Sequence, residues 1–191
     1  MARVAQGPMA KPRGDGRMGR TDMVTISLRG EDILLDGVPT YPGRFWKGQR
    51  VEGQLISMRM VNAIFDDLNP ETRAPWIYPD TRTWDPERNV TEFLGMLLAY
   101  RRFGVLGVTI NLQGGSPEGY CEIQPWINTA FTAYGELRDA YMDRFDRALK
   151  RLDELGMIAI VGLFYHLQDL RLVANEMVMR HWSRWAHAPS P

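Results

Sequence analysis

The sequence predicts an α/β fold with a parallel sheet, because the chain contains one helix–strand plan twice. Residues 89–112 read as an amphipathic helix, a glycine and an apolar, β-branched strand, and residues 135–165 repeat that order. Each glycine stands where a helix ends, a position that favours the left-handed backbone conformation. Strands that are apolar on both faces and alternate with helices are typical of a parallel sheet covered by helices.

The segments before these units predict a disordered arm, a small β ribbon, one further helix and a long loop. Residues 1–22 are rich in Gly, Pro and Arg and have no apolar period, so we expect a disordered basic arm. The ordered domain should then span residues 23–191. It should begin with an antiparallel ribbon that turns at Asp36-Gly37. Helical spacing of apolar residues predicts a helix over residues 52–68, ahead of a loop rich in proline and aromatic residues.

Composition excludes several classes of partner. Lys and Arg total 23, as do Asp and Glu, so neither nucleic acid nor an anionic membrane surface would gain much from the charge of this chain. No apolar run is long enough to span a bilayer, and no signal peptide is recognisable at the start. A single cysteine, Cys121, cannot form an internal disulfide and reads as a small packed residue. These features predict a cytoplasmic protein.

Polar side chains follow both strands of the repeated plan at the point where each strand ends. Ligands of α/β folds bind beyond the carboxyl ends of the strands, so these side chains are candidate ligand contacts. A structural role is the alternative for each, since amides also satisfy backbone groups at strand ends and Gly114-Gly115 is an ordinary turn. The candidates are Asn111 and Gln113 after the first strand and Tyr165, His166, Gln168 and Asp169 after the second.

Neutral amides, an imidazole and loop aromatics are the groups that bind hydroxyl-rich ligands. A sugar offers many hydrogen-bond donors and acceptors, together with apolar ring faces that lie against an aromatic side chain. Trp84 and Tyr120 complete the candidate set for that reason. The alternative for the loop tryptophans is that they hold long loops down by packing.

The sequence predicts no metal site and no cofactor. Asp66 and Asp67 with Glu71 could offer carboxylates, but acidic residues beside an Asn-Pro stop are commonly solvated. The three histidines show no ligand spacing. A phosphate ligand would favour a P-loop lysine, and neither GKS nor GKT occurs.

Several motifs resemble a family of largely uncharacterised bacterial, cellulase-like (β/α)8-barrel proteins. They are LLDGVPTYPGRFWKG, MVNAIFDDLNPETR, YPDTRTWDPERN, INLQGGSPEGY, QPWINTAF and DELGMIAIVGLFYHLQD, which together lie within residues 31–172. The resemblance implies a partial barrel of about three strand–helix units and a carbohydrate ligand. It also implies hydrolysis of O-glycosyl bonds in full-length relatives, and it puts the first barrel strand at residues 41–46.

The chain departs from this family where the fourth strand should carry an acid/base glutamate. Asn175-Glu176 matches the expected residue pair, but the spacing around it is helical, so Glu176 reads as a solvated helix residue. We therefore expect a truncated, catalytically incomplete domain whose open sheet edge could self-associate. Two functions stay open: a glycoside hydrolase-like protein, and a non-catalytic carbohydrate-binding or interaction module.

Overall fold

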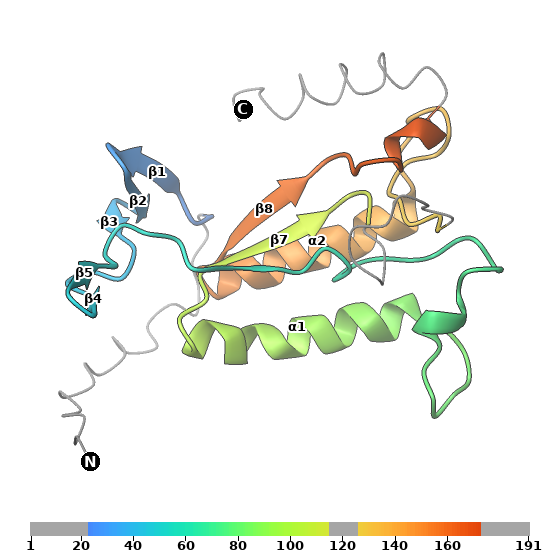
Figure 1. Cartoon of the computed structure of the whole chain (residues 1–191), viewed down its shortest axis with the longest axis horizontal. Coiled ribbons are helices and arrows are strands. Elements are labelled where there is room, and N and C mark those ends of the chain that lie inside the picture. Colours follow the sequence, from blue (N-terminus) through green and yellow to red (C-terminus); the bar gives the residue numbers. More distant parts are fainter. Residues whose placement is uncertain (1–22, 115–125, 173–191) are drawn as a thin grey trace.

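The computed structural model describes residues 23–114 and 126–172, which form a mixed α/β structure with one parallel sheet and two small antiparallel pieces (Figure 1). In chain order the elements are β1 (Ile26–Arg29), β2 (Asp32–Leu35), β3 (Val38–Pro39), β4 (Phe45–Trp46), β5 (Gln49–Arg50), β6 (Ser57–Arg59), the 3₁₀ turn η1 (Ala74–Trp76), α1 (Pro86–Arg102), β7 (Gly107–Asn111), α2 (Asp139–Glu154), β8 (Ile158–Gly162) and the 3₁₀ turn η2 (Asp169–Arg171).

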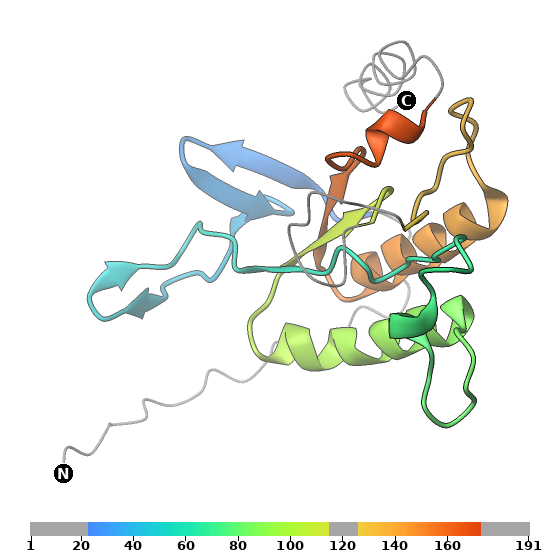
Figure 2. The same ribbon diagram turned by 45° about the vertical axis from the view of Figure 1, so that its right-hand side comes forward.

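The parallel sheet has the order β6-β7-β8. In its register, Val108 lies beside Met58 on one side and Ala159 on the other. Helices α1 and α2 cover one face of this sheet in both ribbon views (Figures 1 and 2). The prediction of two neighbouring parallel strands within residues 105–112 and 157–165 is therefore confirmed.

Local residues account for where helix α1 begins and ends. The side chain of Asp85 accepts hydrogen bonds from the backbone N–H groups of Glu87 and Arg88, and Pro86 occupies the first turn, where its missing N–H costs nothing. Beyond the helix, Gly104 has a φ of 91°, a conformation that glycine adopts without strain.

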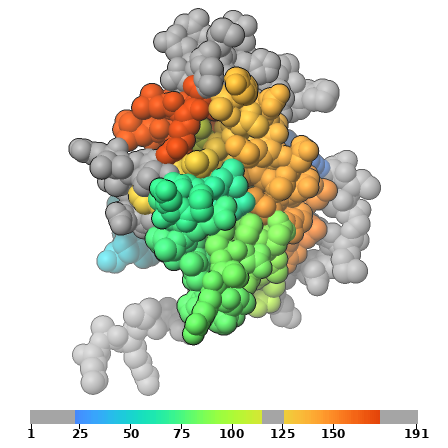
Figure 3. Space-filling view, turned by 90° about the vertical axis from the view of Figure 1, so that its right-hand side faces the viewer, coloured from blue at the N-terminus to red at the C-terminus, as the bar shows by residue number. Residues whose placement is uncertain are grey.

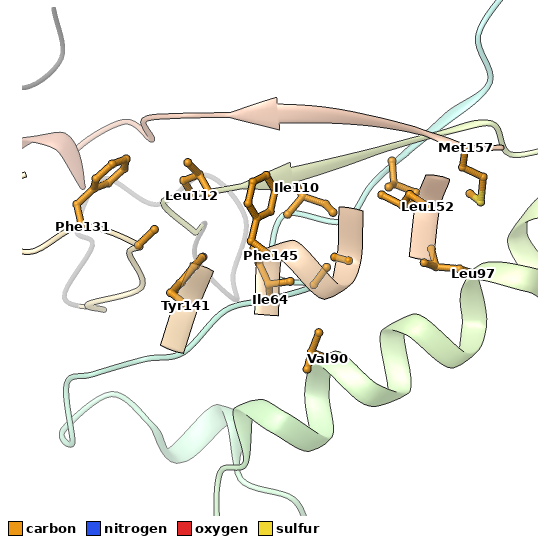
Figure 4. Close-up of a cluster of buried hydrophobic side chains, with 14 of the residues drawn as sticks. Ile64, Val90, Leu97, Ile110, Leu112, Phe131, Tyr141, Phe145, Leu152 and Met157 are labelled. Carbon is orange, nitrogen blue, oxygen red and sulfur yellow. The ribbon is translucent and has the colours of Figure 1, made fainter. Parts of the chain in front are cut away.

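The core lies between the helices and the covered face of the sheet. Ile110 of β7 and Leu112, the residue after that strand, point into it, while Val90 and Leu97 enter from α1 (Figure 4). Helix α2 adds a stripe at helical spacing: Tyr141, Phe145, Ala148 and Leu152. This alternation along β7 sends Thr109, Asn111 and Gln113 to the opposite face of the sheet.

The antiparallel ribbon β1–β3 lies beyond the amino-terminal ends of the parallel strands (Figure 1). Asp36 and Gly37, with φ values of 50° and 76°, form the predicted turn between β2 and β3. The hydroxyl of Tyr41 donates to the carbonyl of Gly104 at 2.7 Å, which ties the ribbon to the end of α1.

The predicted helix over residues 52–68 is wrong. That stretch contains β6, followed by turns in which the consecutive residues Ala63, Ile64 and Phe65 are all buried. Three consecutive buried residues do not fit one face of a helix. Pairing of Ser57–Arg59 with β7 overrides the helical spacing, which arose from a short strand and an apolar loop placed end to end.

The expectation that residues 41–46 supply the first strand of the parallel sheet is also wrong. Phe45 and Trp46 form β4, which pairs antiparallel with β5 in a separate hairpin. Tyr41, with a φ of 48°, lies in a turn before it. The first parallel strand is β6. The proposed basic arm, residues 1–22, lies outside the described residues.

Candidate functional site

The carboxyl ends of the three parallel strands open into loops that meet at one edge of the sheet. Residues 126–131 cross these loops: the N–H of Gly114 donates to the carbonyl of Asn128 at 2.7 Å, and that of Leu68 donates to Ile127 at 2.9 Å. Figure 3 faces this edge, with the loop after β6 in teal to green, the segment from residue 126 in gold and the segment after β8 in red-orange. We call this region the strand-end edge.

Gln113 lies at this edge as predicted, but its side chain is already engaged. Its Nε2 donates to the carbonyl of Gln168 at 3.3 Å, and its Oε1 accepts from the N–H of Tyr165 at 2.8 Å. Gln168 in turn donates from Nε2 to the carbonyl of Trp126 at 2.9 Å. Both glutamines are 1 % exposed. Through these hydrogen bonds the two glutamines hold the chain after β8 in place, and we call them clamps.

The clamped segment is a tight turn that presents His166. The N–H groups of Gln168 and Asp169 both donate to the carbonyl of Tyr165, at 3.0 and 3.1 Å. Leu167 has a φ of 66°, a left-handed conformation that costs a non-glycine residue about 1 kcal/mol. His166 is exposed, whereas Tyr165 and Asp169 are half-buried. The structure thus brings Gln113, Tyr165, His166, Gln168 and Asp169 to one region.

Asn111 is the most buried of the predicted residues whose side chains make no hydrogen bond within the described ranges. It ends β7 on the face away from the helices and is 7 % exposed. Its backbone carbonyl accepts a hydrogen bond from the Tyr141 hydroxyl at 3.1 Å, but its amide makes no hydrogen bond within residues 23–114 and 126–172. A nearly buried amide in this state is a candidate ligand contact.

Sequence reasoning missed Asn128, which organises the edge. Its Oδ1 accepts from the N–H of Asp66 at 3.3 Å and its Nδ2 donates to Oδ1 of Asn62 at 3.4 Å. A β-carbon at Gly114 would lie 1.5 Å from Nδ2 of Asn128, so only glycine fits there. In the sequence, the one signal of this close approach is the Gly114-Gly115 pair, which we interpreted as an ordinary turn.

Trp84 packs in an aromatic cluster of the loops before α1. Its ring centroid lies 4.5 Å from that of Phe65, and it stacks on Tyr78 at 5.9 Å. The indole Nε1 donates to Oδ1 of Asp66 at 3.1 Å. The Arg88 guanidinium lies 3.9 Å from the centroid of the Tyr78 ring. Burial, and then the hydrogen bond to Glu92, raises the pKa of Tyr78 to about 12. These contacts match the alternative in which the tryptophan holds a long loop down.

Arg144, from α2, was not singled out in the sequence and is 3 % exposed. Its Nη1 lies 3.2 Å from Oε1 of Glu87, and its Nη2 lies 3.9 Å from Oδ2 of Asp66. Arg147 pairs with the second oxygen of Glu87. Burial raises the pKa of Glu87, but the hydrogen bonds from Arg147 and Arg144 outweigh it and lower that pKa overall. The network fixes the strand-end edge against both helices.

The carboxylates considered for a metal do not converge. Asp67 is fully buried, and its oxygens accept from the N–H groups of Asn69 and Ile127, each at 3.0 Å, and from the Thr72 hydroxyl at 2.6 Å. Within the described ranges, no group of three His, Cys, Asp or Glu side chains could hold a metal ion. Tyr120, Cys121 and Glu176 lie outside those ranges.

Comparison with known proteins adds no relative. No family model, no curated protein and no solved structure matches this chain. In the part of the chain that the structure describes, no helix has the length and apolar character needed to cross a membrane.

Proposed function

We propose that this protein binds a carbohydrate at the strand-end edge of its parallel sheet. The observation that carries the proposal is the amide of Asn111, which is 7 % exposed and makes no hydrogen bond to a described residue. A ligand hydroxyl that pairs with this nearly buried amide would contribute about 0.5–1.5 kcal/mol of binding free energy. An amide both donates and accepts, as does a sugar hydroxyl.

The proposal includes a barrel-like architecture. Three neighbouring parallel strands, helices on one face and a ribbon at the amino-terminal ends fit the first units of a (β/α)8 barrel. Asn111 would then face the barrel interior, and His166 and Tyr165 would line its mouth. In such folds the ligand binds at the carboxyl ends of the strands.

Binding is the better supported of the two functions considered. Glycoside hydrolysis needs two carboxyl groups that flank one bond. Of the adjacent carboxylates Asp66 and Asp67 in the loop after β6, Asp67 accepts three hydrogen bonds, and Asp66 accepts one from Trp84 and lies near Arg144. Neither is disposed as an acid or a nucleophile, whereas the Asn111 amide is available.

Titration of the purified chain with cellohexaose, xylohexaose and mannohexaose, followed by calorimetry, tests this function. We expect at least one to bind, and Asn111→Ala to lower its affinity about tenfold, the equivalent of one hydrogen bond to a nearly buried amide. The matched control is Gln49→Ala, which removes an exposed amide from the hairpin beyond the other end of the sheet. No binding by any of the three, or equal binding by Asn111→Ala, would contradict the proposal.

A further inference from the structure

Gly162, the last residue of β8, lies beside Asn111 in the register of the sheet. A β-carbon at Gly162 would lie 2.3 Å from Oδ1 of Asn111 and 3.0 Å from its Cγ. The first distance is far shorter than a van der Waals contact. The Asn111 side chain therefore extends across the face of the sheet and occupies the space above Gly162.

The backbone of Gly162 gives no reason for a glycine. Its φ lies outside the left-handed region, unlike that of Gly104 or Gly156. Glycine in a strand costs stability, because it has no side chain to pack and loses more chain entropy on folding. A close approach by another group accounts for it, and that group is the amide of Asn111.

We propose that Gly162 is a positioning residue, whose missing side chain sets the pose in which the Asn111 amide meets the ligand. This inference rests on the proposed carbohydrate function. The backbone of Asn111 has little freedom to retreat from a side chain at position 162. It belongs to the central strand of the sheet, and its carbonyl accepts the hydrogen bond from Tyr141. A methyl group at position 162 would therefore displace the amide rather than the strand.

The test compares Gly162→Ala, Asn111→Ala and the double variant. We expect Gly162→Ala to weaken binding of the oligosaccharide that the wild type binds by about tenfold, as Asn111→Ala does. Because Gly162 acts through Asn111, the double variant should bind no more weakly than Asn111→Ala alone. Gly95→Ala on α1 is the matched control, since its β-carbon meets no atom within 4 Å. It should bind as the wild type does.

A readout without ligand separates this inference from the proposed function. In Gly162→Ala, the side-chain amide resonances of Asn111 in a ¹⁵N–¹H spectrum should shift, while the urea midpoint stays near that of the wild type. If no oligosaccharide binds the wild type, the carbohydrate function fails, and the shift still decides whether Gly162 positions Asn111. Unchanged Asn111 resonances, or wild-type affinity in a binding-competent Gly162→Ala protein, would overturn the inference.

If Gly162→Ala fails to fold, a further variant shows whether the clash with Asn111 is the cause. The double variant Asn111→Ala with Gly162→Ala removes the amide that the new methyl group would strike. It should restore the folded state if the clash is the cause. Failure of the double variant to fold would show that Gly162 serves the strand itself and would overturn the positioning role.

Discussion

Amide side chains at the strand-end edge serve two different purposes. Gln113 and Gln168 are buried and bind backbone groups of the loops. They supply the hydrogen bonds that the backbone of an irregular segment would otherwise lack. Asn111 is almost as buried and binds no described residue through its amide. The same residue chemistry thus supports the loops at two positions, and at the third it supplies the amide that we propose binds the ligand.

The clamp role of Gln113 predicts a loss of stability on substitution. Gln113→Leu keeps most of the volume but leaves the N–H of Tyr165 and the carbonyl of Gln168 without this partner. We expect the free energy of unfolding, measured by urea titration, to fall by about 2–4 kcal/mol. Gln49→Leu, in an exposed hairpin, should change it by less than about 0.5 kcal/mol. A Gln113→Leu protein as stable as the wild type would refute the clamp.

Helices α1 and α2 are joined by charge as well as by apolar packing. Glu87, in the first turn of α1, accepts from Arg144 and Arg147 of α2. It also lies at the positive end of the α1 dipole, where a carboxylate is stabilising. Arg144 is the buried member of this pair network and contacts the carbonyl of Ile64 at 3.4 Å. The link therefore reaches from two helices to the loop after β6.

This link predicts a pH-dependent stability. The pKa of Glu87 is lowered from its ordinary value of 4.5, since the hydrogen bonds from Arg147 and Arg144 outweigh burial. A lowered folded-state pKa stabilises the fold above the ordinary pKa, and the contribution disappears as the pH falls through the folded value. Glu87→Gln should therefore be less stable than the wild type at pH 7, with the difference shrinking toward pH 3.

Urea titrations at both pH values measure this difference. Glu31→Gln is the matched control, because Glu31 lies in the exposed turn between β1 and β2. It should follow the wild type at both pH values. If the loss of stability in Glu87→Gln stayed constant with pH, the charge of the carboxylate would not be what stabilises its contacts with the arginines.

At the scale of the whole molecule, the two described helices cover the same face of the parallel sheet. Parallel sheets are usually covered on both faces. Edge strand β8 leaves Ile160 and Val161 39 % and 38 % exposed. The expectation of self-association rests on this edge, since a strand with no partner on its outer side among the described residues can pair with another copy.

We expect the chain to hydrolyse no glycoside by itself. An oxocarbenium-like transition state needs an acid and an opposed carboxylate, and Asp66 and Asp67 after β6 are engaged in structural hydrogen bonds. Release of nitrophenol from aryl β-glucosides should not exceed that of a buffer blank. Turnover that Glu176→Gln or Asp169→Asn abolishes would contradict this expectation and identify the catalytic acid.

The sequence by itself determined the elements whose signals are local. Helical spacing with a terminal glycine located α1 and α2, and the apolar runs located β7 and β8. Asp36-Gly37 located a turn, because its conformation depends on its own residues. The strand-end amides were found for the same reason, since they follow directly on a recognisable strand.

Only the tertiary structure decided the rest. β6 is a strand because β7 pairs with it. A strand of three residues is too short for its own periodicity to predict that pairing. Gln113 and Asn111 are alternate residues of one segment with the same side-chain chemistry. Gln113 is a clamp, whereas the Asn111 amide makes no hydrogen bond to a described residue, because the chain after β8 returns to Gln113 and leaves Asn111 facing a glycine. Long-range contacts of this kind are set by chain topology, which a single sequence does not display.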